Sequence, residues 1–404
     1  MLQKSVLKSK KYIFIAMLAV LILLALTSMF FAENVSATTA AEEEIQKELE
    51  DNVNKNLEDI DFSELVQFEK KLGGMSYEGG ITKLIKDILS GEYNGGFEDT
   101  FNLIINMLGV SIKGFLPLLV TLIAVSVIFS IVNGLTSGFM SKSTTEIIHF
   151  VCYSAMIVIL MTEVTFLISD SVKAIKNMSA FMEIIFPIML TLVTALGGIA
   201  TTVTYSPMMT VLSVGVAKII SSIVLPCFIA TMALSIVGFI SKDIKLNKLT
   251  SFFKSAGEII IGVVFGLFTT FVTINGISGA LADNISIKSA KFAIASYVPV
   301  LGGYLSEGLD LAVASVMLVK NAVGVGGVIM MMSIVLAPVL KILVFSLGLK
   351  LVAGIIEPIG NKRMSEIIYS ISKNLTLLVV AMLGMAFMFF IMMILILITC
   401  NAGI

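Results

Sequence analysis

Apolar stretches of about 20 residues, the length that an α-helix needs to cross the ~30 Å hydrocarbon core of a bilayer, follow one another from Gly114 to the C-terminus. Four of them are uninterrupted: 114–135, 147–168, 259–281 and 375–399. Three more, at 181–204, 207–240 and 311–356, contain glycine, proline or isolated charges. These interruptions predict broken or re-entrant helices. Because backbone polar groups in lipid must be satisfied internally, we expect an all-α polytopic integral membrane protein with roughly seven to ten spans.

The composition supports this class. Of the 404 residues, 57% are hydrophobic and 14% are charged, whereas soluble domains average roughly 45–50% and 25%. The net charge of −1 gives no reason to expect a nucleic-acid partner. Cys152, Cys227 and Cys400 lie in apolar stretches without C-x-x-C spacing, which argues against a disulfide framework or a zinc site.

The N-terminus has the pattern of a secretion signal. Four lysines between positions 4 and 11 precede an apolar run over 12–31, and Val35-Ser36-Ala37 supplies small residues at a cleavage site. We therefore predict a signal peptide over 1–37; an uncleaved signal anchor is the alternative. In both cases the following segment begins on the extracytoplasmic side.

Residues 38–107 form the one sizeable polar segment. Glu42–Lys71 is acidic and carries apolar residues at helical spacing, and a second amphipathic helix is expected over 81–89, between glycine pairs. We interpret 38–107 as a small extracytoplasmic helical cap with a solvated acidic face. A docking site for a partner protein is the alternative.

The membrane region, 108–404, contains an internal repeat. Residues 143–148 (STTEII) match 255–260 (SAGEII) at an offset of 112, which also relates the pairs Lys142/Lys254, Lys176/Lys288, Pro187/Pro299 and Pro226/Pro338. A third, partial copy is MSEII at 364–368. These matches predict tandem helical units at about 117–225, 226–337 and 338–404, each with a proline-led helix, a basic linker and a spanning helix. Such duplication is common in transporters.

The linkers predict the orientation. Lysine and arginine concentrate there, at Lys142, at Lys242, Lys245, Lys248 and Lys254, and at Lys362, Arg363 and Lys373. By the positive-inside rule all three linkers face the cytoplasm, which agrees with an extracytoplasmic segment before the first span.

No residue pattern points to catalysis. The sequence contains no G-x-x-x-x-G-K-[ST] phosphate loop and no H-E-x-x-H motif, and His149 is the one histidine. We therefore predict a protein that is not an enzyme and has no cofactor and no metal site.

Ionisable residues within apolar stretches are the remaining candidates. A charge at bilayer depth is costly unless it is paired or hydrated, so we consider five residues as path or partner contacts: Lys218, Lys320, Glu163, Glu307 and Asp310. The alternative is that the lysines extend to the interface and that the 286–310 stretch is only a re-entrant hairpin. Six residues are predicted to shape the helices: Pro187, Pro226, Pro299, Gly302, Gly303 and Pro338.

Several motifs together resemble one family. They are SIKSAKFA at 286–293, VPVLGG at 298–303, KNAVG at 320–324 and IEPI at 356–359. With the signal peptide and acidic segment before them, they are similar to the stage III sporulation protein AE family of endospore-forming Firmicutes. Ala295-Ser296 departs from that pattern, where an acidic or amide residue is expected.

The resemblance implies a membrane subunit of a secretion-like channel complex between the mother cell and the forespore. It implies as partners other stage III sporulation membrane proteins, a separate ATPase subunit and a forespore-membrane protein across the intermembrane space. The expected location is the mother-cell membrane around the forespore. The alternative function is an autonomous secondary transporter that binds a small solute where the repeat units meet.

Overall fold

The computed structural model describes residues 40–72, 79–93, 97–139, 142–240, 246–297, 302–359 and 362–399, and the elements in these ranges are helical. Three short helices come first: α2 (Ala40–Glu58), α3 (Ser63–Lys71) and α4 (Gly80–Leu89). Long helices follow: α5 (Phe97–Phe139), α6 (Lys142–Ala195), α10 (Asn247–Tyr297), α11 (Gly302–Ile356) and α12 (Lys362–Ile398). From Ile199 to Ile240 the chain is continuously helical, through α7 (Ile199–Thr210), η1 (Val211–Val216), α8 (Ala217–Ile219), η2 (Ile220–Val224) and α9 (Leu225–Ile240). A 3₁₀ turn, η3 (Glu357–Ile359), follows α11.

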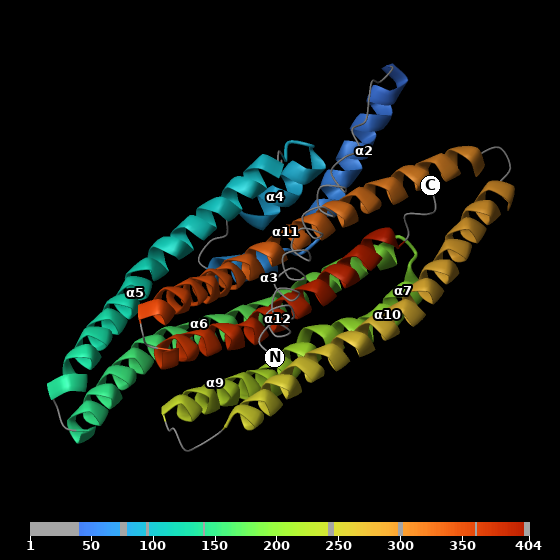
Figure 1. Ribbon diagram of the computed structural model, residues 1–404. Helices are drawn as coiled ribbons and strands as arrows, with labels where there is room; N and C mark the ends of the chain where they lie inside the picture. The colour runs from blue at the N-terminus through green and yellow to red at the C-terminus, as the bar shows by residue number, and fades with distance from the viewer. Residues whose placement is uncertain are drawn as a thin grey trace.

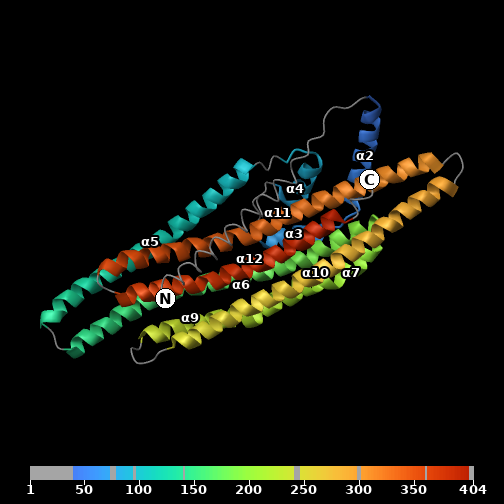
Figure 2. The same ribbon diagram turned by 45° about the vertical axis from the view of Figure 1, so that its right-hand side comes forward.

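Three antiparallel hairpins make up the long bundle: α5–α6, α9–α10 and α11–α12 (Figure 1). The C-terminal ends of α5, α9 and α11 and the N-terminal ends of α6, α10 and α12 lie at the same end of the bundle in both views, which we call the linker end (Figures 1 and 2). The other ends of α10 and α11 project beyond α6, α7 and α12 (Figure 2). In each hairpin the first helix carries a proline (Pro117, Pro226 or Pro338) and the second begins near a Glu-Ile-Ile sequence, the arrangement that the repeat predicts. The repeat itself stays a prediction.

Six helices in the described part of the chain are long and apolar enough to cross a membrane. This number is lower than the seven to ten expected, because the predicted stretch 147–168 and most of 181–204 lie in one helix, α6. The stretches 207–240 and 311–356 are also continuous helices and are not divided at Pro226 or Pro338. The stretch 181–204 differs too: α6 ends at Ala195, a turn follows with Gly197 at φ 83°, and α7 starts at Ile199. The interruption within 207–240 takes the form of two π-helical segments, η1 and η2.

Helices α11 and α12 form the centre of the bundle. Phe345, Phe389 and Met385 are fully buried there, and Phe389 stacks on Phe186 of α6 with ring centroids 5.5 Å apart. Inside the core the hydroxyls of Ser346 and Ser372 each donate to the other residue's carbonyl oxygen, over 3.0 and 2.9 Å. Small residues with hydroxyls allow two helices to approach closely and bond across their interface in an apolar environment.

The short N-terminal helices pack on the half of the bundle remote from the linkers. Their buried residues are Val53, Leu57, Leu65, Phe68, Ile81, Leu84 and Ile85. Asn56 donates to Ser315 of α11 over 2.9 Å, and Phe68 stacks on Phe181 of α6 at 6.0 Å. The amphipathic helices expected before the membrane region are therefore present, with the 42–71 pattern divided into α2 and α3, and their apolar faces are covered by the chain itself.

Three glycines within one turn of α11 make this packing possible. A Cβ on Gly324 would collide with Leu397 of α12, one on Gly327 would lie 3.2 Å from Ile185 of α6, and one on Gly326 would lie 3.1 Å from Ile85 of α4. The turn therefore accepts a neighbour on each of three sides, and Gly326 is where α4 rests on the bundle.

Candidate functional site

Lys320 is fully buried at the end of the α11–α12 interface. Its Nζ donates to the carbonyl oxygens of Leu397 and Thr399, over 3.1 and 2.6 Å. The last carbonyls of a helix have no partner within it and carry the negative end of the helix dipole. The Lys320 ammonium therefore caps α12 and compensates part of the cost of its own burial.

A second charged contact joins α6 and α11. Lys341 Nζ lies 2.9 Å from Asp170 Oδ2, with the two side chains 38% and 26% exposed. The same ammonium lies 5.9 Å from the centroid of the Phe166 ring, within the range of a cation–π contact. This pair compensates two charges inside candidate spans, as apolar surroundings require.

A polar node lies where α9, α10 and α12 meet. Lys254 donates to the Lys373 carbonyl over 3.0 Å and lies 3.5 Å from Asn374 Oδ1. The amide of Asn374 donates to Ser235 over 3.4 Å, and the Ser235 and Ser370 hydroxyls lie 2.8 Å apart. Hydrogen bonds of this kind hold helices together in apolar surroundings.

Arg363, in the first turn of α12, connects three hairpins. Its guanidinium donates to the carbonyl oxygen of Phe239 near the end of α9 and lies 5.3 Å from the centroid of the Tyr153 ring of α6. A cation at the C-terminal end of α9 is favourable to that helix's dipole. Nearby, Ser130 of α5 donates to the Ile359 carbonyl over 2.7 Å. The linker end of the bundle is thus tied across hairpins.

Lys218 lies apart from these contacts, on α8. Its side chain is exposed and shares an open cavity with Lys176, Ser179 and Glu183 of α6. The structure thus does not bring Lys218 and Lys320 together, since Lys218 faces α6 and Lys320 binds the end of α12.

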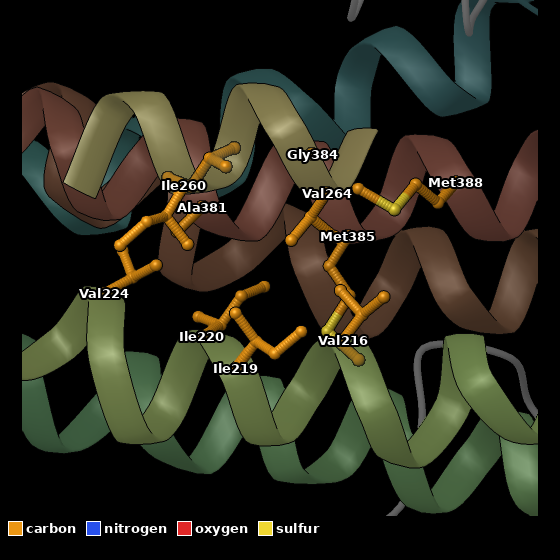
Figure 3. Close-up of a pocket in the computed structure, with 11 residues that line it drawn as sticks. Val216, Ile219, Ile220, Val224, Ile260, Val264, Ala381, Gly384, Met385 and Met388 are labelled. Carbon is orange, nitrogen blue, oxygen red and sulfur yellow. The ribbon is translucent and has the colours of Figure 1, made fainter. Parts of the chain in front are cut away.

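Away from Arg363, the three predicted repeat units also meet at an apolar place. Side chains of Ile220, Ile260 and Met385, one from each unit, line a gap of about 10 Å³, and Figure 3 shows the labelled side chains facing one another across it. A cavity needs about 10–15 Å³ to hold a single water molecule. This gap is therefore packed core, and it offers no polar group that could bind a solute.

The remaining predicted residues are dispersed. Glu163 is half-buried on α6. Glu307 and Asp310 belong to the first turns of α11, for which only the backbone is described. Pro187 and Pro338 lie inside α6 and α11, and Pro226 is in the first turn of α9. Gly302 and Gly303 begin α11, while Pro299 lies outside the described residues.

The sequence did not single out Asp170, Asn374 or Arg363 as contact residues. Asp170 pairs with a lysine 171 positions away, and Arg363 binds a backbone carbonyl 124 positions away. Neither separation leaves a local pattern. The sequence marks each of these residues only as a polar residue within or beside an apolar stretch. Among the described residues, no three His, Cys, Asp or Glu side chains are grouped so that they could hold a metal ion.

Comparisons with known proteins agree on one family. A family model described as stage III sporulation protein AE matches residues 80–400. The stage III sporulation protein AE of Bacillus subtilis (strain 168) is 24% identical over 382 residues, which cover 94% of this chain and 96% of that protein. No solved structure matches.

Proposed function

The chain belongs to the stage III sporulation protein AE family, and from this premise we propose that it is a non-catalytic membrane subunit of a channel complex between mother cell and forespore. The match over residues 80–400 is the observation that carries the proposal, because it includes all six candidate spans. The family match and the six candidate spans support a multi-pass membrane protein of a sporulation family. The role in a channel complex goes beyond them and is the proposal.

The dimensions of the helices support a role in a larger assembly. At about 1.5 Å per residue, the 55 residues of α11 extend over about 80 Å, more than twice the ~30 Å hydrocarbon core. A span that begins at the basic linkers therefore leaves tens of ångströms of α11 on the far side of the bilayer. There the helix is in contact with α2 and α4, and the projecting part is available to partner proteins.

The polarity of the ends supports an orientation. Lys248, Lys362 and Arg363 lie at the linker end, which the positive-inside rule assigns to the cytoplasm. The N-terminal helices contact α11 near Gly326, 30 residues before its end at Ile356 and so about 45 Å along the helix. In this orientation α2–α4 lie in the space between the two membranes.

The deciding experiment combines genetics and purification in the spore-forming host. Deletion of the gene should arrest development after engulfment, and the tagged full-length protein should co-purify with other sporulation membrane proteins and an ATPase subunit. Normal sporulation of the deletion strain contradicts the proposal. Solute uptake by the purified protein alone in vesicles, without partners, would instead support the autonomous transporter.

A further inference from the structure

An open cavity of about 230 Å³ lies between α6 and the facing segment α8–η2. Five polar residues line it: Lys176, Ser179 and Glu183 of α6, and Lys218 and Ser221 of the facing segment. Buried Ile175 and Ala217 are among the apolar residues of the lining. The cavity is separate from the charged contacts of Lys320 and Lys341 and has no part in the proposed function.

The two lysines of this cavity are not compensated by a carboxylate. Within the described part of the chain, neither Lys176 nor Lys218 forms an ion pair or a hydrogen bond. The one acidic group of the cavity is Glu183, whose Oε1 lies 3.1 Å from the hydroxyl oxygen of Ser179. The cavity therefore has a formal charge of +1, from two lysines and one glutamate. Two ammonium groups at one opening favour an anion.

The wall that carries Lys218 is held in position by an unusual backbone. Ser179 donates to the carbonyl oxygen of Ser213, in the π-helical segment η1, over 2.7 Å. A second π-helical segment, η2, begins directly after α8 and contains Ser221. Short π-helical segments inside α-helices occur frequently at functional sites. Lys218 and Ser221, which follow η1 in the chain, line the cavity opposite the residues of α6.

The depth of the cavity matches a lipid headgroup. Lys218 lies 22 residues (240 − 218) before the end of α9, or about 33 Å along the helix. That is close to the ~30 Å hydrocarbon thickness of a bilayer. With the end of α9 at one surface of the membrane, Lys218 lies at the opposite surface, where phosphates of the other leaflet are found, and Lys176 borders the same cavity.

From these observations we propose that Lys176, Lys218 and Ser221 form a binding site for a phosphate-bearing anion, the headgroup of an anionic phospholipid or a free phosphate. The ammonium groups attract the phosphate oxygens, the Ser221 hydroxyl donates to them, and the Glu183 carboxylate weakens binding by repulsion. The apolar lining, which includes Ile175 and Ala217, accommodates the glycerol and first acyl carbons of a lipid.

The test uses the full-length protein in detergent, with bound lipid counted by native mass spectrometry. Dioleoyl-phosphatidylglycerol is titrated against dioleoyl-phosphatidylcholine. The double variant K176M/K218M removes both charges and keeps apolar stems, and K173M is the matched control, because exposed Lys173 lies on α6 outside the cavity. Each lysine near an anionic lipid surface contributes about 1 kcal/mol of binding free energy. The double variant should therefore bind phosphatidylglycerol about 30-fold more weakly, whereas K173M should bind it as the parent does.

Glu183→Gln tests the same site with the opposite sign. It removes the repulsive charge and should tighten phosphatidylglycerol binding severalfold, a gain that misfolding cannot produce. Inorganic phosphate against chloride at equal ionic strength then separates the sources. Displacement of the lipid by phosphate shows that the free anion occupies the site, and resistance to displacement assigns it to the lipid. Equal losses in K173M and K176M/K218M, unchanged or weaker binding in E183Q, or no preference for phosphatidylglycerol overturns the proposal.

Discussion

The ammonium group of Lys320 donates to the carbonyl oxygen of Thr399 over 2.6 Å, although the two residues are 79 positions apart in the chain. Lys320 is fully buried, so this bond and the 3.1 Å bond to Leu397 replace hydration at both ends of the contact. The relationship fixes the end of α12 against the middle of α11. It also gives a structural role to Lys320, which the sequence identified as a candidate for lining a transport path or contacting a partner.

Replacement of Lys320 by methionine should destabilise the bundle by about 2–4 kcal/mol. The Leu397 and Thr399 carbonyls would lose a charged donor inside the protein, and each unsatisfied buried group costs about 1–3 kcal/mol. Thermal unfolding of the detergent-solubilised protein should show a Tm several degrees lower, and K320Q, which keeps a donor, should lose less. Exposed Lys173 provides the control K173M. A Tm equal in K320M and K173M would show that the contact contributes nothing.

The Lys341–Asp170 pair should behave as a coupled unit. D170N or K341M alone leaves an unpaired charge beside apolar side chains, and each should cost about 1 kcal/mol or more, since partial exposure reduces the effect. The double variant D170N/K341M should cost less than the sum of the single changes. Denaturation of all four proteins gives a double-mutant cycle. A coupling free energy of zero would mean that the 2.9 Å contact is not formed in the membrane.

The sequence predicted the class of fold because hydropathy depends on local composition. It also predicted the amphipathic helices before the membrane region, since apolar residues at helical spacing need only their own segment as evidence. The continuous helix through Pro226 could not be predicted. Proline removes one donor, but in a packed bundle its neighbours determine whether the helix stops. Here the irregularity is distributed over η1 and η2.

The candidate residues show the same division. Lys320 and Lys218 stood out as charges in apolar stretches, but the sequence could not say that one binds a helix end and the other borders a cavity. Those outcomes depend on which helix lies opposite. Asp170 was missed since its partner is remote in sequence. Gly326 was missed as well, because a glycine in an apolar helix carries no sign of the Ile85 side chain that rests on it.

A side chain at Gly326 should displace the N-terminal helices. In G326V the added atoms would press on Ile85 of α4, whose Cγ1 is 3.1 Å from the position of a Cβ. We expect faster proteolysis of the 40–93 region in detergent while the long helices stay protected. G266V is the matched control, because nothing lies within 4 Å of a Cβ there. Equal cleavage of the parent, G326V and G266V would contradict the close packing of α4 on α11.

The polar node at Asn374 should stabilise the junction of α9, α10 and α12. N374L removes the bond to Ser235 and the oxygen near Lys254, which should cost about 0.6–2 kcal/mol, the range for hydrogen bonds between helices in membranes. Thermal unfolding in detergent measures the change. T191V is the control, because exposed Thr191 bonds the Pro187 carbonyl of its own helix. A loss in T191V as large as in N374L would argue against a specific role of the node.

Cysteine labelling should reveal which ends of the helices face the cytoplasm. In a variant without the native cysteines, made in vegetative cells, where the extracytoplasmic side faces the medium, E92C should react with a membrane-impermeant maleimide in intact cells, since exposed Glu92 follows α4. K248C, at the exposed start of α10, should react only after permeabilisation, because basic linkers stay on the cytoplasmic side. Labelling of both sites in intact cells would contradict this orientation, and the reverse pattern would invert it. The lysine cavity would then lie at the cytoplasmic leaflet, and α2–α4 would meet partners inside the mother cell.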